Sequence, residues 1–205
     1  MNKFFKSFMI QFNICPLFLY ILMLLNFVEK AEAVASKEVF QKYSNPVFIE
    51  TGSYYGDGIA QALETGFKEV YSIELSPYLH AKCVERFQSN PHVHLYQGDS
   101  SVVLKDILEN LHEQATFWLD GHYSEGETAK GKSCTPILEE LALIATHPIK
   151  CHTILIDDVR QFGTVSFDFI QLDDIDKALK RINPRYQILF EDGYVPNDIL
   201  VAQIL

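Results

Sequence analysis

Two short acidic motifs carry the side chains best suited to chemistry in this sequence. Asp120 and His122 stand in the first motif, and Asp157 and Asp158 are adjacent in the second. Each motif follows a short apolar run of the kind that forms a buried strand. A neutral imidazole suits the removal of a proton from a hydroxyl, so we interpret Asp120 and His122 as candidate catalytic residues.

The three carboxylates have more than one interpretation. Carboxylates held close together raise one another's pKa unless a cation neutralises them, and oxygen ligands suit Mg²⁺, which could hold and polarise substrate oxygens. In the structural alternative, Asp157 caps the turn after its strand, Asp158 pairs with Arg160, and His122 is an ordinary hydrogen-bonding residue. Catalysis without a metal is the third interpretation.

A glycine-rich turn follows an earlier apolar run. The segment 50–58 begins with Glu50 and carries glycines at Gly52, Gly56 and Gly58. Such glycines allow a tight turn and let a ligand approach backbone N–H groups at a helix start. The spacing G-x-x-x-G-x-G differs from the dinucleotide fingerprint G-x-G-x-x-G, which disfavours a nicotinamide-dependent oxidoreductase. A plain strand-to-helix turn remains the alternative.

Two further strand ends are acidic. Glu74 comes about 20 residues after the glycines, where a carboxylate can accept hydrogen bonds from both hydroxyls of a ribose. Asp99 precedes Ser100 and is placed to accept from an amino group such as that of adenine. Each also fits a helix entry, with Ser76 as N-cap in the first case and Asp99 itself as the cap in the second. The ends of three successive predicted strands, which carry the glycine turn, Glu74 and Asp99, are thus polar. Together they favour a nucleoside ligand.

The elements that must position these residues alternate along the chain. Apolar, β-rich runs cover residues 46–51, 69–74, 92–96, 115–120 and 152–157, and helical spacing covers residues 58–64, 77–88, 101–111 and 136–145. This alternation is typical of a parallel sheet with helices on both faces. The last two runs, 186–190 and 198–204, are too close for a parallel crossover. We therefore predict an α/β, Rossmann-like, doubly wound, mostly parallel sheet with an antiparallel C-terminal strand.

The motif Glu50-Thr51-Gly52-Ser53-Tyr54-Tyr55-Gly56 resembles the cofactor loop of class I S-adenosylmethionine-dependent methyltransferases. Its form E-x-G-x-x-x-G is similar to that of macrocin-type sugar O-methyltransferases and cephalosporin-hydroxylase-like proteins. The resemblance implies that S-adenosylmethionine is bound by Glu50, Gly52, Ser53, Gly56, Glu74, Asp99 and Ser100. It also implies a magnesium site made by Asp120, Asp157 and Asp158.

The resemblance implies methylation of a hydroxyl on a small-molecule or sugar acceptor, with Mg²⁺ assisting. The chain has 205 residues and a formal net charge of -10, and this acidic field disfavours nucleic acid as a partner. The segment 124–134 is rich in glycine and small polar residues, so it is a candidate lid or acceptor-selecting loop. A non-catalytic, exported binding module that keeps the fold is the alternative function.

The first 35 residues differ in composition from the remainder. Lys3 and Lys6 precede an apolar run over residues 14–28, and Ala31 and Ala33 then form an Ala-x-Ala pattern. These are the parts of a secretory signal peptide, and an uncleaved anchor or a buried amphipathic helix are the alternatives. We therefore predict a signal peptide or anchor in residues 1–35, a methyltransferase-like domain in residues 36–205, and export or membrane attachment through the first segment.

Overall fold

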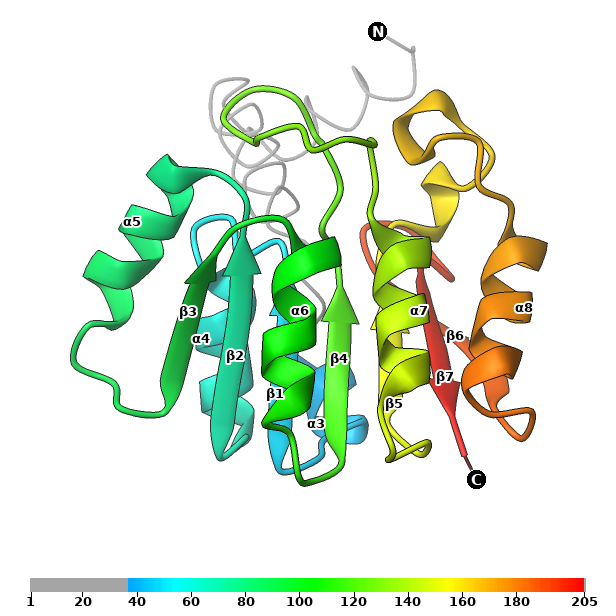
Figure 1. Ribbon diagram of the computed structural model, residues 1–205, viewed down its shortest axis with the longest axis horizontal. Helices are drawn as coiled ribbons and strands as arrows, with labels where there is room; N and C mark the ends of the chain where they lie inside the picture. Colours follow the sequence, from blue (N-terminus) through cyan, green and yellow to red (C-terminus); the bar gives the residue numbers. More distant parts are fainter. Residues whose placement is uncertain (1–36, 205) are drawn as a thin grey trace, which may run out of the picture. The chain divides into compact units, whose positions relative to one another are not determined.

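The computed structural model describes residues 37–204, and its helices and strands carry the labels of Figure 1. Seven strands form one sheet in the order β3-β2-β1-β4-β5-β7-β6. The strands are β1 Val47–Thr51, β2 Glu69–Glu74, β3 Val93–Gln97, β4 Ala115–Leu119, β5 Thr153–Ile156, β6 Gln187–Glu191 and β7 Ile199–Gln203. Strands β1 to β5 pair in parallel, whereas β7 is antiparallel to both β5 and β6. The fold class predicted from the sequence is confirmed.

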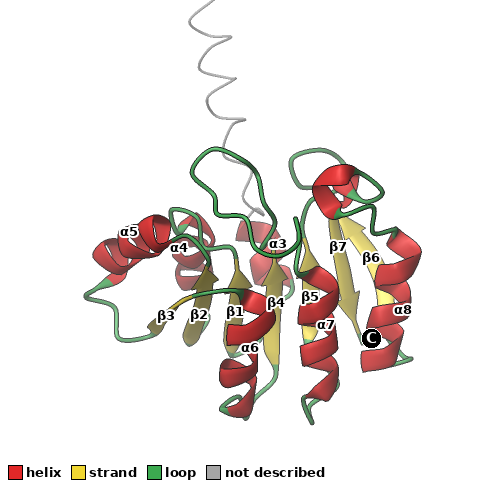
Figure 2. Ribbon diagram, turned by 45° about the horizontal axis from the view of Figure 1, so that its top comes forward, coloured by secondary structure: helices red, strands yellow, loops and turns green. Residues whose placement is uncertain are grey.

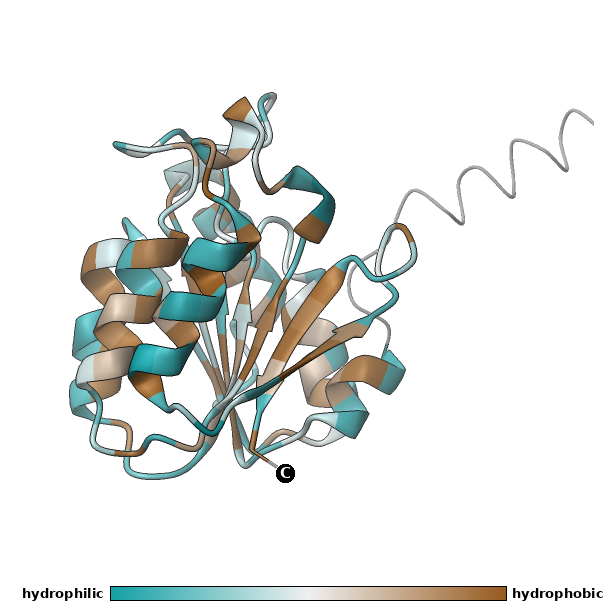
Figure 3. Ribbon diagram, turned by 90° about the vertical axis from the view of Figure 1, so that its right-hand side faces the viewer, coloured by the Kyte–Doolittle hydropathy of each residue, from teal (hydrophilic) through white to brown (hydrophobic). Residues whose placement is uncertain are grey.

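Helices cover both faces of this sheet (Figure 1). The helices are α3 Lys37–Lys42, α4 Asp57–Thr65, α5 Pro77–Phe87, α6 Ser100–Glu109, α7 Ile137–Thr146 and α8 Leu172–Ile182, with short 3-10 turns η1 Val159–Gln161 and η2 Val165–Phe167. Helices α6, α7 and α8 bury their apolar side chains on one face, and α3, α4 and α5 bury theirs on the other. Strands covered on both faces are apolar along most of their length, as the hydropathy colouring shows (Figure 3).

Helix α8 lies outside the helices predicted from the sequence. Its signal is nonetheless present, because Ile175, Leu179 and Ile182 recur at helical spacing and are all buried. A capping box between Gln171 and Asp174 marks its start. This helix lengthens the connection between β5 and β6 and packs beside α7.

The predicted location, exported or held at a membrane, is corrected by the structure. No helix within residues 37–204 is long and apolar enough to cross a membrane. The predicted signal peptide or anchor falls on residues 1–35, which lie outside the described residues.

Two buried histidines are hydrogen-bonded to each other near the start of β5. The amide of Ala115 donates to Nδ1 of His152 (3.1 Å), so the ring proton of His152 is on Nε2 and is donated to Nδ1 of His147 (2.8 Å). Nε2 of His147 donates in turn to the carbonyl of Leu111 (3.0 Å). With both rings neutral, every ring nitrogen of the two histidines therefore has a hydrogen-bond partner. Burial, together with His147, lowers the pKa of His152 to about 4.

This arrangement predicts that acid destabilises the fold. Between about pH 6.5 and pH 4 the unfolded chain binds a proton at His152 and the folded chain does not, so the free energy of unfolding falls as pH falls, by at most about 3 kcal/mol. His152→Gln should flatten this dependence, and His112→Gln, at an exposed histidine, should not. Urea unfolding at several pH values measures the slopes, and equal slopes for wild type and His152→Gln would contradict the prediction.

Candidate functional site

The carboxyl ends of the parallel strands lie at one edge of the sheet (Figure 2), and the predicted site residues stand at or just after these strand ends in the sequence. The loop after β1 lies against the end of β4. Gly52 has a φ of 84°, and a Cβ placed on it would lie 2.5 Å from the carbonyl oxygen of Asp120. The amides of Gly52 and Ser53 both donate to the carbonyl of Ile73 in β2 (2.9 and 3.3 Å). Only glycine therefore fits at this position without displacement of the backbone.

Glu50 is buried beneath the glycine loop. The hydroxyl of Ser72 donates to its Oε2, and Ser72 is also hydrogen-bonded to the hydroxyl of Ser53 (2.5 Å). A Cβ on Gly58 would overlap Oε1, so the carboxyl lies directly against the start of α4. Burial raises the pKa of Glu50 to about 8, with the charge of Asp120 adding to the effect. Glu50 supports the loop from inside the protein.

Glu74 joins two segments at the end of β2. Its Oε2 accepts from the amide of Tyr54 (2.9 Å), and its Oε1 accepts from the amide of Ser76 (2.8 Å). Ser76 is the N-cap of α5, with Pro77 in the first turn, as the structural interpretation predicted. Each carboxylate oxygen can accept a second hydrogen bond, so these contacts leave Glu74 with further acceptor capacity.

Asp99 and Ser100 are engaged within the protein at the start of α6. Asp99 caps the helix, and its Oδ1 accepts from the amide and the hydroxyl of Ser101 (3.0 and 2.6 Å). The hydroxyl of Ser100 donates to Oε1 of Glu140 in α7 (2.6 Å). Glu140 was missed by the sequence analysis because it stands in an ordinary amphipathic helix. Burial raises its pKa to about 7.

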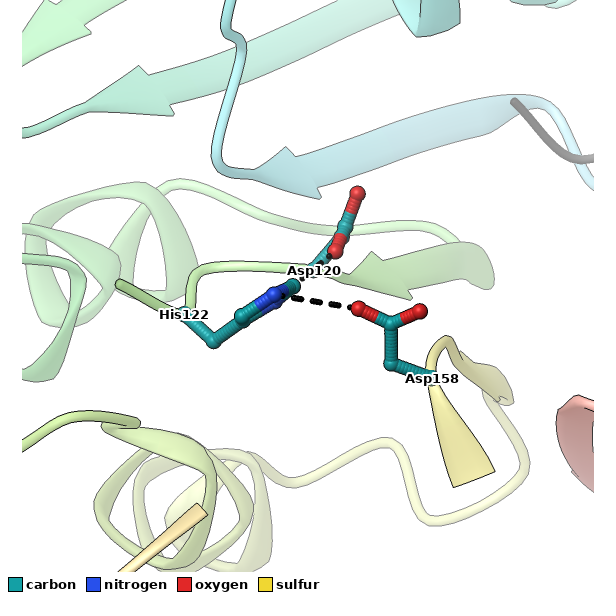
Figure 4. Close-up of side chains that lie close together, drawn as sticks. All are labelled: Asp120, His122 and Asp158. Atoms are coloured by element: carbon teal, nitrogen blue, oxygen red, sulfur yellow. Dashed lines mark ion pairs between the residues drawn. The ribbon is translucent and has the colours of Figure 1, made fainter. Parts of the chain in front are cut away.

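The acidic residues after β4 and β5 meet around His122 (Figure 4). Nδ1 of His122 lies 3.2 Å from Oδ1 of Asp120, and Nε2 lies 3.0 Å from Oδ2 of Asp158. Nε2 is also 2.8 Å from the hydroxyl of Ser124. Burial lowers the pKa of His122, but the charges of Asp120 and Asp158 outweigh this and raise it above its usual value. The imidazolium form is therefore stabilised between two carboxylates.

Asp157 and Asp158 make the contacts that the structural interpretation predicted. Oδ1 of Asp157 accepts from the amide of Asp158 (2.8 Å), and Arg160 pairs with both Asp158 (2.5 Å) and Asp198. Burial raises the pKa of Asp157 to about 9, and the charges of Asp120 and Asp158 add to the effect.

Within residues 37–204, the ligand atoms of Asp120, Asp157 and Asp158 do not form one group. Asp120 and Asp158 share a group with His122, and Asp157 and Asp158 share another with Asp198. Each group has atoms close enough together to hold a metal ion. The structure thus divides the predicted magnesium ligands between two neighbouring positions.

Several solved structures have the same fold as this chain. The methyltransferase PaMTH1 of Podospora anserina, bound to SAH, is 15% identical, with a TM-score of 0.55 over 82% of this chain and 76% of that one. An O-methyltransferase of Bacillus cereus in complex with SAH is 15% identical, with a TM-score of 0.55 over 90% and 89%. TomG of Streptomyces achromogenes, an O-methyltransferase of tomaymycin synthesis in complex with SAM, is 12% identical, with a TM-score of 0.54 over 82% and 77%.

This chain has the class I methyltransferase fold. The resemblance seen in the sequence is thereby confirmed for the fold. No protein-family model matches the sequence, and no curated protein matches it.

In this methyltransferase fold, the loop between β4 and α7, residues 120–136, reaches the predicted cofactor residues. The hydroxyl of Tyr55, next to the glycine loop, donates to Oε2 of Glu127 (2.5 Å). A Cβ placed on Gly131 would lie 3.5 Å from Oδ2 of Asp99 and 3.6 Å from Leu75. The predicted lid therefore lies beside the loops after β1, β2 and β3.

The contact between Gly52 and Asp120 can be tested by substitution in the glycine loop after β1. Gly52→Ala combines a left-handed backbone with a clash against Asp120, so we expect a loss of about 2–5 kcal/mol in the free energy of unfolding. Gly66→Ala is the matched control, because Gly66 has a φ of 93° with nothing within 4 Å of its Cβ position. That variant should lose only about 1–2 kcal/mol. Urea denaturation measures both, and equal losses would contradict the role of the contact.

Proposed function

We propose that the chain is an S-adenosylmethionine-dependent methyltransferase that acts on a hydroxyl of a small molecule or sugar. The observation that carries this proposal is the position of His122 between Asp120 and Asp158, at the same edge of the sheet as the glycine loop after β1. No observation in residues 37–204 favours a non-catalytic binding module over this function. The O-methyltransferases of the same fold support the choice of reaction.

The negative charge of the residues at the strand ends is complementary to the positive centre of S-adenosylmethionine. The methionine end would lie along Gly52, Ser53 and Gly56, the ribose at Glu74, and the adenine near Asp99. The carboxyl groups of Glu50, Asp57, Glu74 and Asp120 interact electrostatically at this edge. A site surrounded by carboxylates favours a ligand with a positive centre. Glu50 and Ser100, whose side chains are engaged within the protein, would support the binding loops from below.

The bound cofactor supplies a methyl group on a sulfonium centre, which is already activated for transfer to oxygen. The protein residues then have two roles. They align the acceptor, which supplies much of the rate, and they remove its proton. His122 in its neutral form would accept the hydroxyl proton, and Asp120 and Asp158 would stabilise the imidazolium that results. No other described histidine lies between two carboxylates at this edge.

The proposal predicts separate effects on binding and turnover. S-adenosylmethionine should bind the full chain, and His122→Gln should keep its affinity within about threefold while methyl transfer falls about 10²- to 10⁴-fold. Asp120→Asn should act in the same direction, because it removes half of the charge that stabilises the imidazolium. His112→Gln, far from this edge in the amino-end loop before β4, is the matched control and should leave both unchanged.

Calorimetric titration measures the binding, and release of S-adenosylhomocysteine across a panel of phenols, catechols and sugars measures the transfer. Absence of cofactor binding by the folded full chain would reject the proposed function. Full turnover in His122→Gln would reject His122 as the proton acceptor.

A divalent cation is an alternative to His122 for activating the acceptor hydroxyl. The group of Asp120, His122 and Asp158 offers two carboxylates and one imidazole, which fits Mg²⁺ and, because of the nitrogen donor, fits Mn²⁺ better. With a cation held there, His122 would be a ligand instead of the proton acceptor, and the cation would lower the pKa of the acceptor hydroxyl.

We therefore expect Mn²⁺ to bind more tightly than Mg²⁺, and Asp158→Asn to weaken both by about tenfold or more. Asp173→Asn, at an exposed carboxylate of α8 paired with Lys177, is the matched control. Calorimetry with each metal chloride is the measurement. Equal affinity in wild type and Asp158→Asn would show that the cation, if bound at all, binds elsewhere.

A further inference from the structure

Two consecutive residues between β5 and α8 have left-handed backbones without being glycine. Asp168 has a φ of 50° and Phe169 a φ of 59°. Such conformations persist where surrounding contacts hold them, and they cluster at functional sites. The contacts of Asp168 and of its neighbour Phe167 show what holds this segment.

The carboxylate of Asp168 binds the end of the loop between β4 and α7. Its Oδ2 accepts from the amide of Cys134 (2.6 Å) and from the amide of Thr135 (3.2 Å). These two amides lie just before Pro136, the N-cap of α7. Hydrogen bonds to an ionised acceptor are among the stronger ones in proteins, so Asp168 holds this end of the loop in place.

The side chain of Phe167 packs at the other end of the same loop. It is almost fully buried, and its ring centroid lies 5.0 Å from that of His122. The ring of Phe162 also packs against that of Phe167, with ring centroids 5.3 Å apart. Adjacent residues thus contact the loop at His122, near its start, and at Cys134 and Thr135, at its end.

Between these two points the loop turns back toward the predicted cofactor residues, through the contacts of Glu127 with Tyr55 and of Gly131 with Asp99. A backbone hydrogen bond from Tyr123 to the carbonyl of Cys134 (2.7 Å) closes its base. In Figure 2 the loop rises from β4 and returns to α7, next to the segment that carries η1 and η2. Contacts that hold the base of this loop in place therefore determine the positions of both His122 and the loop tip.

We propose that Phe167 and Asp168 form a clamp of positioning residues, which orients His122 and holds the β4–α7 loop over the cofactor. This inference rests on the proposed function for the identity of the ligand. The inference adds that the segment after β5 determines both the orientation of His122 and the position of the loop that covers the cofactor. Neither clamp residue takes part in the chemistry.

Asp168→Gly tests the clamp without imposing strain, because glycine adopts the left-handed backbone readily and removes only the carboxylate. Asp168→Asn is the conservative variant, because asparagine tolerates this backbone and keeps one acceptor oxygen. The control is Asp173→Asn, at an exposed carboxylate nearby in the chain. Asparagine is used there instead of glycine because Asp173 lies in the first turn of α8, which glycine would disturb. Thermal unfolding checks that each variant is folded.

Hydrogen exchange of the peptide covering residues 121–136 is the first readout. We expect exchange in Asp168→Gly to be at least about tenfold faster at Cys134 and Thr135, and exchange in Asp168→Asn to return close to that of wild type. Titration with S-adenosylhomocysteine is the second readout, with about tenfold weaker binding in Asp168→Gly and recovery in Asp168→Asn.

Wild-type exchange rates in folded Asp168→Gly would overturn the clamp. Faster exchange with unchanged affinity for S-adenosylhomocysteine would overturn its role in covering the cofactor. If wild type does not bind S-adenosylhomocysteine, the proposed function fails, and the exchange readout still decides whether Asp168 holds the loop.

Discussion

The approach of Gly52 to the carbonyl of Asp120 joins the two halves of the candidate site. Strands β1 and β4 are paired neighbours, and the amide of Asp120 extends their pairing by donating to the carbonyl of Thr51 (3.2 Å). Because Gly52 has no side chain, the loop after β1 turns directly over the end of β4. The glycine loop and the acidic residues around His122 consequently lie side by side, as a reaction between a cofactor and an acceptor requires.

Buried carboxyl groups lie on both sides of this contact. Glu50 lies under the glycine loop on the face covered by α4, and Glu140 reaches Ser100 from α7 on the opposite face. Burial raises the pKa of both, to about 8 and about 7, because charge is costly away from water. A positive charge nearby would favour their ionised forms.

Several features of the fold and the site could be predicted because their cause is local in the sequence. Apolar runs bounded by turn residues predicted the strands, and the short connection before β7 predicted its antiparallel direction. Helix caps at Ser76 and Asp99 were recognised from residue type alone. Helix α8 was missed although its spacing and capping box were visible. The assignment of Glu50, Glu74 and Ser100 to direct cofactor contact stays a prediction, and each has a partner within the protein.

The sequence by itself determined which segments form strands and in which direction they run, and therefore which residues follow the carboxyl ends of parallel strands. Only the tertiary structure decided the partners of those residues. His122 lies between Asp120 and Asp158, Arg160 joins Asp158 to Asp198, and Asp168 binds amides 33 and 34 residues earlier in the chain. Strand direction follows from local periodicity and connection length, whereas these contacts depend on how distant segments pack in three dimensions, which residue spacing does not encode.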